Sequence, residues 1–102
     1  MTLAPQKVID RILECIDRGL LALGENTREA IYWHVRQDYG LSRDDFVARP
    51  AEFTKALVDW FGKGGERVLE RAIVNEMKRE FEIGGKAETY EEAVASVGRR
   101  RA

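Results

Sequence analysis

A chain of 102 residues with 44% hydrophobic and 34% charged side chains has the length and composition of one globular domain, which argues against disorder. A formal net charge of −1 excludes a strong overall attraction to nucleic acid or anionic membranes, and no apolar run reaches membrane-spanning length. A single cysteine excludes an intramolecular disulfide, and residues 1–5 lack the regions of a signal peptide, so we expect a cytoplasmic protein.

The first predicted helix covers about residues 5–23, because Pro5 suits a first turn and apolar residues then recur at helical spacing. Cys15 lies on this apolar face. A reactive cysteine needs exposure and a nearby cation or base, so we interpret Cys15 as a core residue. Gly19 interrupts the face at a cost in helix propensity, and close approach of another backbone would explain it. Gly24 ends the helix.

The second predicted helix begins at Asn26, because Glu29 follows three residues later as in a capping box, and it ends at Gly40. A short helical turn starts at Ser42 and closes before Pro50, since the residue preceding a proline avoids helical backbone angles. The apolar residues of the second helix are Ala30, Ile31, Trp33 and Val35, and those of the turn are Phe46 and Val47.

Pro50 opens a third helix with a narrow apolar stripe, and the glycines from Gly62 to Gly65 break it. A fourth helix over about residues 66–82 has a broader apolar arc, which includes Val68, and should be central. Gly84 and Gly85 end it. The residues that we expect in the core of these two helices are Phe53, Leu57, Trp60, Phe61, Leu69, Ile73 and Met77.

The end of the chain predicts one more helix and a basic tail. Thr89 and Glu92 form a capping box that opens a short helix, which should run through Val97 and fray at Gly98. No strand pattern is convincing. We therefore predict an all-α fold, a compact bundle of four main helices with a short helical turn and a C-terminal helix. It forms one domain over residues 1–98, followed by a basic tail at 99–102.

The charge is distributed unevenly along the chain. Removing Arg99, Arg100 and Arg101 from the 17 basic residues leaves 14 against 18 acidic ones, a net charge of −4 for the rest. The three arginines can contact nucleic acid, although such a terminal run is more often a solvated tail. Lys63 lies in a glycine-rich turn before a helix, where backbone amides can hold an anion, but the full spacing of a phosphate-binding loop is missing.

His34 is the only histidine and a candidate polar site. A metal site would combine it with Asp38 one turn later and with Asp44 or Asp45, but His and Cys do not recur at the spacing of metal ligands. We therefore predict a half-buried histidine that bonds a backbone carbonyl, with no metal and no cofactor.

No nucleophile–base pair or metal cluster is recognisable, so we expect no enzyme activity and no catalytic residues. Acid–base work by Glu70, Glu76 and Glu80 is the less favoured interpretation. Salt bridges to Arg67, Arg79 or another helix explain these three glutamates as well.

The stretch from Tyr39 to Arg43 resembles the turn of a helix-turn-helix DNA reader. The following residues place Asp44 and Asp45 where phosphates would approach, and Pro50 cuts the segment short. DNA binding through this turn and the basic tail is therefore the alternative function, and nucleic acid is a disfavoured partner.

The central residues together resemble the archaeal Nitrosopumilus output domain family. The residues that carry the resemblance are Leu23-Gly24-Glu25, Ile31-Tyr32, Tyr39-Gly40-Leu41, Pro50-x-x-Phe53, Leu57, Phe61-Gly62, Leu69-x-x-x-Ile73, Phe81 and Tyr90-Glu91-Glu92-Ala93. The resemblance implies a small helical module of signalling or transcriptional regulatory proteins, and it supplies no catalytic residues. It covers most of the chain, but its motifs are core and turn positions that do not identify any chemistry.

The function that we expect is a non-catalytic regulatory module that binds another protein or itself, for example as a homodimer. Apolar helix faces are more numerous than a small bundle needs, and the first helix is long enough to present residues outward. The sequence does not say which helix supplies the contact.

Overall fold

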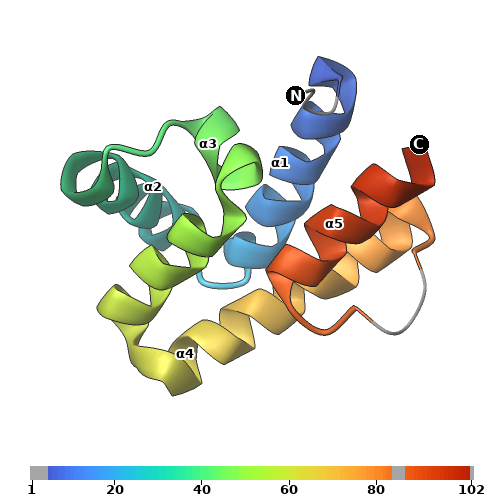
Figure 1. The fold of residues 1–102 in the computed structure, drawn as a ribbon. Coiled ribbons are helices and arrows are strands. Elements are labelled where there is room, and N and C mark those ends of the chain that lie inside the picture. Colours follow the sequence, from blue (N-terminus) through green and yellow to red (C-terminus); the bar gives the residue numbers. More distant parts are fainter. Residues whose placement is uncertain (1–4, 84–86, 102) are drawn as a thin grey trace.

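The computed structural model describes residues 5–83 and 87–101, the last three by their backbone alone, and this part of the chain contains helices and no strand. In chain order the helices are α1 (Gln6–Leu21), α2 (Glu25–Tyr39), α3 (Arg43–Ala48), α4 (Pro50–Phe81) and α5 (Tyr90–Arg101). In Figure 1 α4 bends sharply, and α5 lies alongside its later half. The predicted all-α fold is confirmed.

The bend in α4 lies at Gly62, whose φ of 77° and ψ of 166° are not helical. Glycine adopts a positive φ freely because it has no Cβ. The helix therefore consists of a first arm, residues 50–61, and a second arm, residues 63–81, which correspond to the predicted third and fourth helices. Gly62 alone makes the break, since Gly64 and Gly65 are helical residues of the second arm.

The core forms where α1 packs antiparallel against the second arm, with Arg11 beside Glu80 and Gly19 beside Ile73. A Cβ built on Gly19 would lie 2.9 Å from the Cγ1 atom of Ile73 and 3.0 Å from its Cα atom. Contacts this short would force Ile73 and its backbone to shift, so glycine is the residue that allows this crossing without displacement. The expected close approach is confirmed.

An aromatic cluster joins α3, the first arm of α4 and α5. The ring of Phe46 in α3 stacks on Phe53 of the first arm at 4.3 Å, and Tyr90 of α5 meets Phe53 edge-on at 5.6 Å. Tyr90 is 1% exposed, and its hydroxyl donates a hydrogen bond to the carbonyl of Phe46 at 2.7 Å. Burial raises the pKa of Tyr90 well above its ordinary value. The bond satisfies a hydroxyl that has no access to water.

The predicted core of α4 is right with one exception. Phe61 is half-buried against the core, whereas Trp60 is 43% exposed, so its assignment to the core was wrong. Trp60 lies in the last turn before Gly62, and the ring of His34 from α2 covers only part of it. The buried members of the predicted set are Phe53, Leu57, Leu69, Ile73 and Met77.

Three further apolar residues of the predicted helix faces are exposed, namely Val68 on α4 and Ala30 and Trp33 on α2. Val68 stands five residues before Ile73, and at 3.6 residues per turn that spacing turns it well away from the buried face. On α2 the buried positions are Ile31 and Val35, four residues apart, which leaves room for only a narrow contact.

Side-chain caps occur at two of the predicted helix starts and are missing at a third. Ser42 caps α3 in a capping box, and the Thr89 Oγ1 atom accepts the Glu92 N–H at 3.1 Å, as predicted. The predicted Asn26 cap is wrong, because α2 already begins at Glu25 and no side chain caps it.

The ends of the last two helices also differ from expectation. α4 ends at Phe81, with Glu82 in a left-handed conformation after it, and the predicted stop at Gly84 lies outside the described residues. α5 continues through Gly98 to Arg101, beyond the predicted end at Val97.

Candidate functional site

Aromatic rings form a partly exposed strip across α2 and the first arm of α4. The ring of His34 lies edge-on to Trp33 at 5.4 Å and 4.5 Å from the ring of Trp60. Trp33 is 55% exposed and Trp60 is 43% exposed. Single exposed apolar residues are normal, but two tryptophans linked through a third ring make a patch that is typical of a contact surface. We call Trp33, His34 and Trp60 the aromatic strip.

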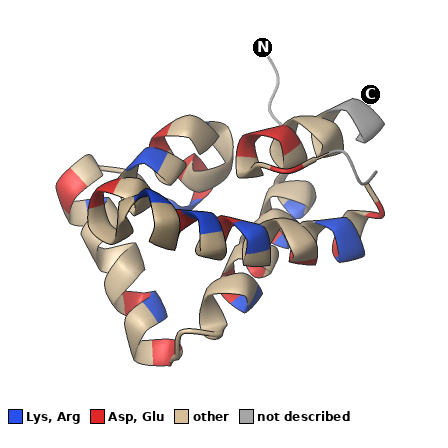
Figure 2. Ribbon diagram, turned by 90° about the horizontal axis from the view of Figure 1, so that it is seen from below, with Lys and Arg blue, Asp and Glu red and all other residues tan. Residues whose placement is uncertain are grey.

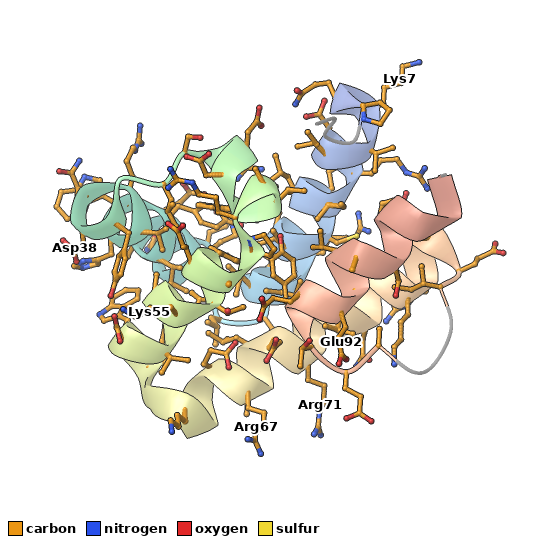
Figure 3. The ribbon with its side chains drawn as sticks, in the orientation of Figure 1. Lys7, Asp38, Lys55, Arg67, Arg71 and Glu92 are labelled. Carbon is orange, nitrogen blue, oxygen red and sulfur yellow. The ribbon has the colours of Figure 1, made fainter. Side chains whose placement is uncertain are left out.

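The strip borders a pocket of about 90 Å³ between α2 and the first arm of α4. Apolar residues from both helices and two aspartates contribute to its lining, and we call it the acidic pocket. Its lining residues are His34, Val35, Asp38, Tyr39, Ala56, Leu57, Asp59 and Trp60. Figure 3 labels Asp38 on α2 at this end of the molecule.

The two aspartates of the acidic pocket are held by neighbouring rings. The Nδ1 atom of His34 lies 3.3 Å from Oδ2 of Asp38, and the hydroxyl of Tyr39 donates to the carboxylate of Asp59. The bond to Asp59 raises the pKa of Tyr39. His34 is partly buried, and its polar partner is this carboxylate, whereas a backbone carbonyl was predicted.

The other aspartates considered for a metal site do not join His34. Asp45 accepts the backbone N–H of Ser42 at 3.0 Å and so caps its own helix, which lowers the pKa of Asp45. Asp44 is exposed on α3. Within residues 5–83 and 87–98, no group of three or more His, Cys, Asp or Glu side chains is arranged to hold a metal ion.

Sequence reasoning missed a buried acid on the second arm of α4. Glu66 is 7% exposed, and its Oε2 atom has no hydrogen-bond partner. Burial, followed by the charge and hydrogen bonding of Glu70, raises the pKa of Glu66 to about 7. Glu70 in turn accepts the backbone N–H of Tyr90 at 2.6 Å. Glu66 stands three residues before buried Leu69, and that helical spacing is the signal that could have revealed it.

Lys63 is exposed at the start of the second arm, beside an open depression of about 470 Å³ that Arg67 and Arg71 also line. Figure 3 shows Arg67 and Arg71 pointing away from the helix. Glu66 and Glu70 line the same depression, and basic and acidic residues are interspersed along the helices in Figure 2. The structure therefore places no purely basic surface around Lys63. The side chains of Arg99, Arg100 and Arg101 lie outside the described residues.

The turn that resembles a DNA reader is tied to α1. Both terminal nitrogens of Arg43 donate to the carboxylate of Asp17, at 3.2 and 3.1 Å, and its guanidinium lies 5.3 Å from the centre of the Tyr32 ring. The hydroxyl of Tyr32 also donates to Asp17 at 2.6 Å. Arg43 is thus engaged within the protein, which counts against its use on phosphates.

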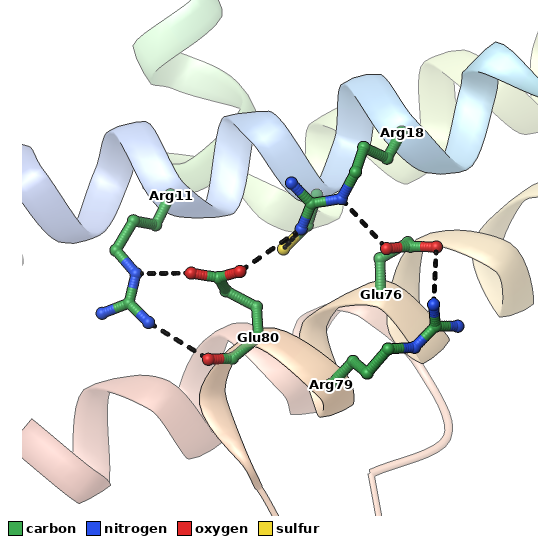
Figure 4. A network of polar contacts seen from close by, with 6 residues as sticks. Arg11, Arg18, Glu76, Arg79 and Glu80 are labelled. Carbon is green, nitrogen blue, oxygen red and sulfur yellow. Dashed lines mark hydrogen bonds and ion pairs between the residues drawn. The ribbon is translucent and has the colours of Figure 1, made fainter.

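A network of ion pairs joins α1 to the second arm of α4 (Figure 4). Arg11 pairs with Glu80 at 2.8 Å, and Arg18 pairs with Glu76 at 3.0 Å and with Glu80 at 3.4 Å. Arg79 also pairs with Glu76, so two of the predicted salt-bridging glutamates have such partners. Exposed pairs of this kind contribute little individually.

Cys15 lies beneath this network and is fully buried. Burial raises the pKa of its thiol to about 11, although Arg18 nearby acts in the opposite direction. A thiol with so high a pKa is a poor nucleophile near neutral pH. The prediction of a core residue is confirmed.

Comparisons of the chain with family models, with curated proteins and with solved structures gave no match. Among the helices of the described residues, none has the length and apolar character needed to cross a membrane.

Proposed function

We propose that this protein is a non-catalytic interaction module that binds another protein, or a second copy of itself as a homodimer, through the aromatic strip. The observation that supports this proposal is the exposure of Trp33 and Trp60 on both sides of His34. Tryptophan is enriched at the centres of protein interfaces, where it contributes a large apolar area together with a polar N–H group.

The wider context of the proposal comes from the resemblance to the archaeal Nitrosopumilus output domain family. It is a role in signal transduction or transcriptional regulation, with no enzymatic reaction. The unpaired, buried thiol of Cys15 agrees with a reducing compartment, so we propose a cytoplasmic location.

The test compares the wild-type protein with a Trp33→Ala, Trp60→Ala double variant in affinity capture and in sedimentation velocity. Val68→Ala is the matched control, because Val68 is also an exposed apolar residue but lies on the second arm of α4. We expect a defined partner, or self-association, with the wild type and the control, and its loss in the double variant. Binding that is equal in all three proteins would refute the use of the strip.

DNA binding is the second candidate function, and one observation favours it. Lys63, Arg67 and Arg71 follow one another at four-residue spacing along the second arm of α4, as expected for a basic stripe on one helix face. Interspersed acids and the engagement of Arg43 by Asp17 weigh against it, because non-specific affinity for DNA depends on a basic surface. We therefore rank it below protein binding.

A further inference from the structure

We propose that the acidic pocket receives an arginine side chain from a basic segment of the protein partner. This inference rests on the proposed function and specifies the chemistry of the partner. It starts from three features that occur together: an apolar floor, aromatic rings and two rim carboxylates. A side chain that complements this pocket has an apolar stem, a flat cationic head group and hydrogen-bond donors.

The volume of the pocket limits the size of the group that it can bind. About 90 Å³ of space accommodates roughly six to nine water molecules, since each needs about 10–15 Å³. Pockets for drug-sized molecules are several times larger, at roughly 300–1,000 Å³. The pocket therefore suits one side-chain head group, and the rest of the partner would lie over the exposed strip formed by Trp33 and Trp60.

The charge of the pocket selects a cation. Asp38 and Asp59 line it from α2 and α4 respectively, and both are exposed residues whose contacts with His34 and Tyr39 are made by the Oδ2 atom. Basic residues of the same helices do not line it, since Lys55 is absent from its lining and Arg36 lines a different depression, beside α3. No lysine or arginine of the described residues thus lines the pocket, where His34 beside Asp38 is the one side chain that can carry a positive charge.

The shape of the pocket favours arginine over lysine. A guanidinium is planar, so it can stack on the Trp60 ring while its N–H groups fork onto the carboxylates of Asp38 and Asp59. A lysine ammonium is a compact point charge that cannot make both contacts in one plane. His34 and Tyr39 orient the two carboxylates, which reduces the entropy lost on binding.

The experiment measures binding of a short glycine-spaced arginine peptide to the whole protein. The background is Trp33→Phe, so that Trp60 is the only tryptophan and its fluorescence reports on the pocket. Matched peptides carry lysine or neutral citrulline in place of arginine. We expect the arginine peptide to bind most tightly and the citrulline peptide to lose about tenfold or more in affinity.

Variants of the protein test the same assignment. Asp38→Asn and Asp59→Asn should each weaken the arginine peptide by about fivefold to tenfold, because each removes one charge-assisted contact. Asp44→Asn is the matched control: it removes the same charge from exposed α3, away from the pocket lining, and should leave affinity unchanged. Far-ultraviolet circular dichroism verifies that all variants remain folded.

Three outcomes would overturn the inference. The citrulline peptide could bind as tightly as the arginine peptide, or both pocket variants could bind the arginine peptide as tightly as the unaltered pocket does. The third outcome is that free arginine amide binds as tightly as the arginine peptide. The last outcome would identify a small-molecule pocket instead of a peptide site. The proposed function fails separately, if the double tryptophan variant still retains the partner or self-associates like the wild type. If that variant loses the partner but the acidic pocket shows no preference for arginine, the aromatic strip remains an interface and only the arginine assigned to the pocket is refuted.

Discussion

Replacing Glu66 by Gln should make the protein more stable at alkaline pH and leave its stability nearly unchanged at acidic pH. The pKa of Glu66 is raised from 4.5 to about 7 in the folded protein, mainly by burial. Folded molecules therefore keep a proton that unfolded molecules release between these two pH values. The stabilising effect of this proton is fully present below about pH 4.5 and is lost as the pH rises through about 7.

The size of the effect follows from the pKa shift. One pKa unit corresponds to about 1.4 kcal/mol, and a shift from 4.5 to about 7 sets an upper limit of about 3–4 kcal/mol. The open depression beside Glu66 admits solvent, which reduces the penalty of the charged form. We expect Glu66→Gln to raise the free energy of unfolding by about 1–3 kcal/mol at pH 8.5. Gln retains a side chain that can donate a hydrogen bond to Glu70.

Urea unfolding followed by far-ultraviolet circular dichroism at several pH values between 4.5 and 8.5 provides the measurement. Glu91→Gln is the matched control, because Glu91 is exposed in the first turn of α5 and its replacement removes the same charge. The stability difference between Glu66→Gln and the wild type should grow with pH, whereas that of Glu91→Gln should stay nearly constant. A constant difference for Glu66→Gln, or destabilisation at pH 8.5, would refute the assignment of a buried, protonated carboxyl group.

Three further predictions concern the packing and the rival function. Gly19→Ala should lower the free energy of unfolding by about 1–3 kcal/mol in chemical denaturation. Gly64→Ala should raise it by about 0.5–1 kcal/mol in the same measurement, because a Cβ atom at Gly64 would point into open space. Tyr90→Phe should cost about 1–3 kcal/mol in the same assay, because the carbonyl of Phe46 loses its buried donor. Duplex DNA should bind only weakly in fluorescence anisotropy, and the binding should be lost at physiological salt and also in a chain that ends at Gly98. Tight binding that survives both the salt and the truncation would favour the DNA reader.

The fold could be predicted from the sequence because its signals are local. The capping boxes at Ser42 and Thr89 and the break at Gly62 depend on a few neighbouring residues. Asn26 shows the limit, since a good cap residue was bypassed when the helix began at Glu25, with Gly24 at the cap position two residues before Asn26. Helical spacing likewise did not distinguish exposed Trp60 from buried Leu57, because that difference depends on where α2 crosses the first arm.

The candidate site could be predicted only in part, because its residues meet through tertiary packing. His34 was recognised as a polar candidate, but its contact with Trp60 joins residues from two helices. Tyr39 and Asp59 are 20 residues apart in sequence, and no periodicity indicates that they form a pair. Such pairings depend on the crossing of α2 and α4, and a single sequence contains no direct signal for a crossing.

The pairing of α1 with the second arm of α4 also affects how the chain can fold during synthesis. Arg11 and Glu80 are separated by 69 residues, so the apolar face of α1 leaves the ribosome long before its partner exists. Contacts of such high sequence separation form late and slow folding, and an exposed apolar helix is prone to aggregate meanwhile. The nascent protein thus depends on its last third, and a chain truncated before Ile73 would leave the face around Gly19 uncovered.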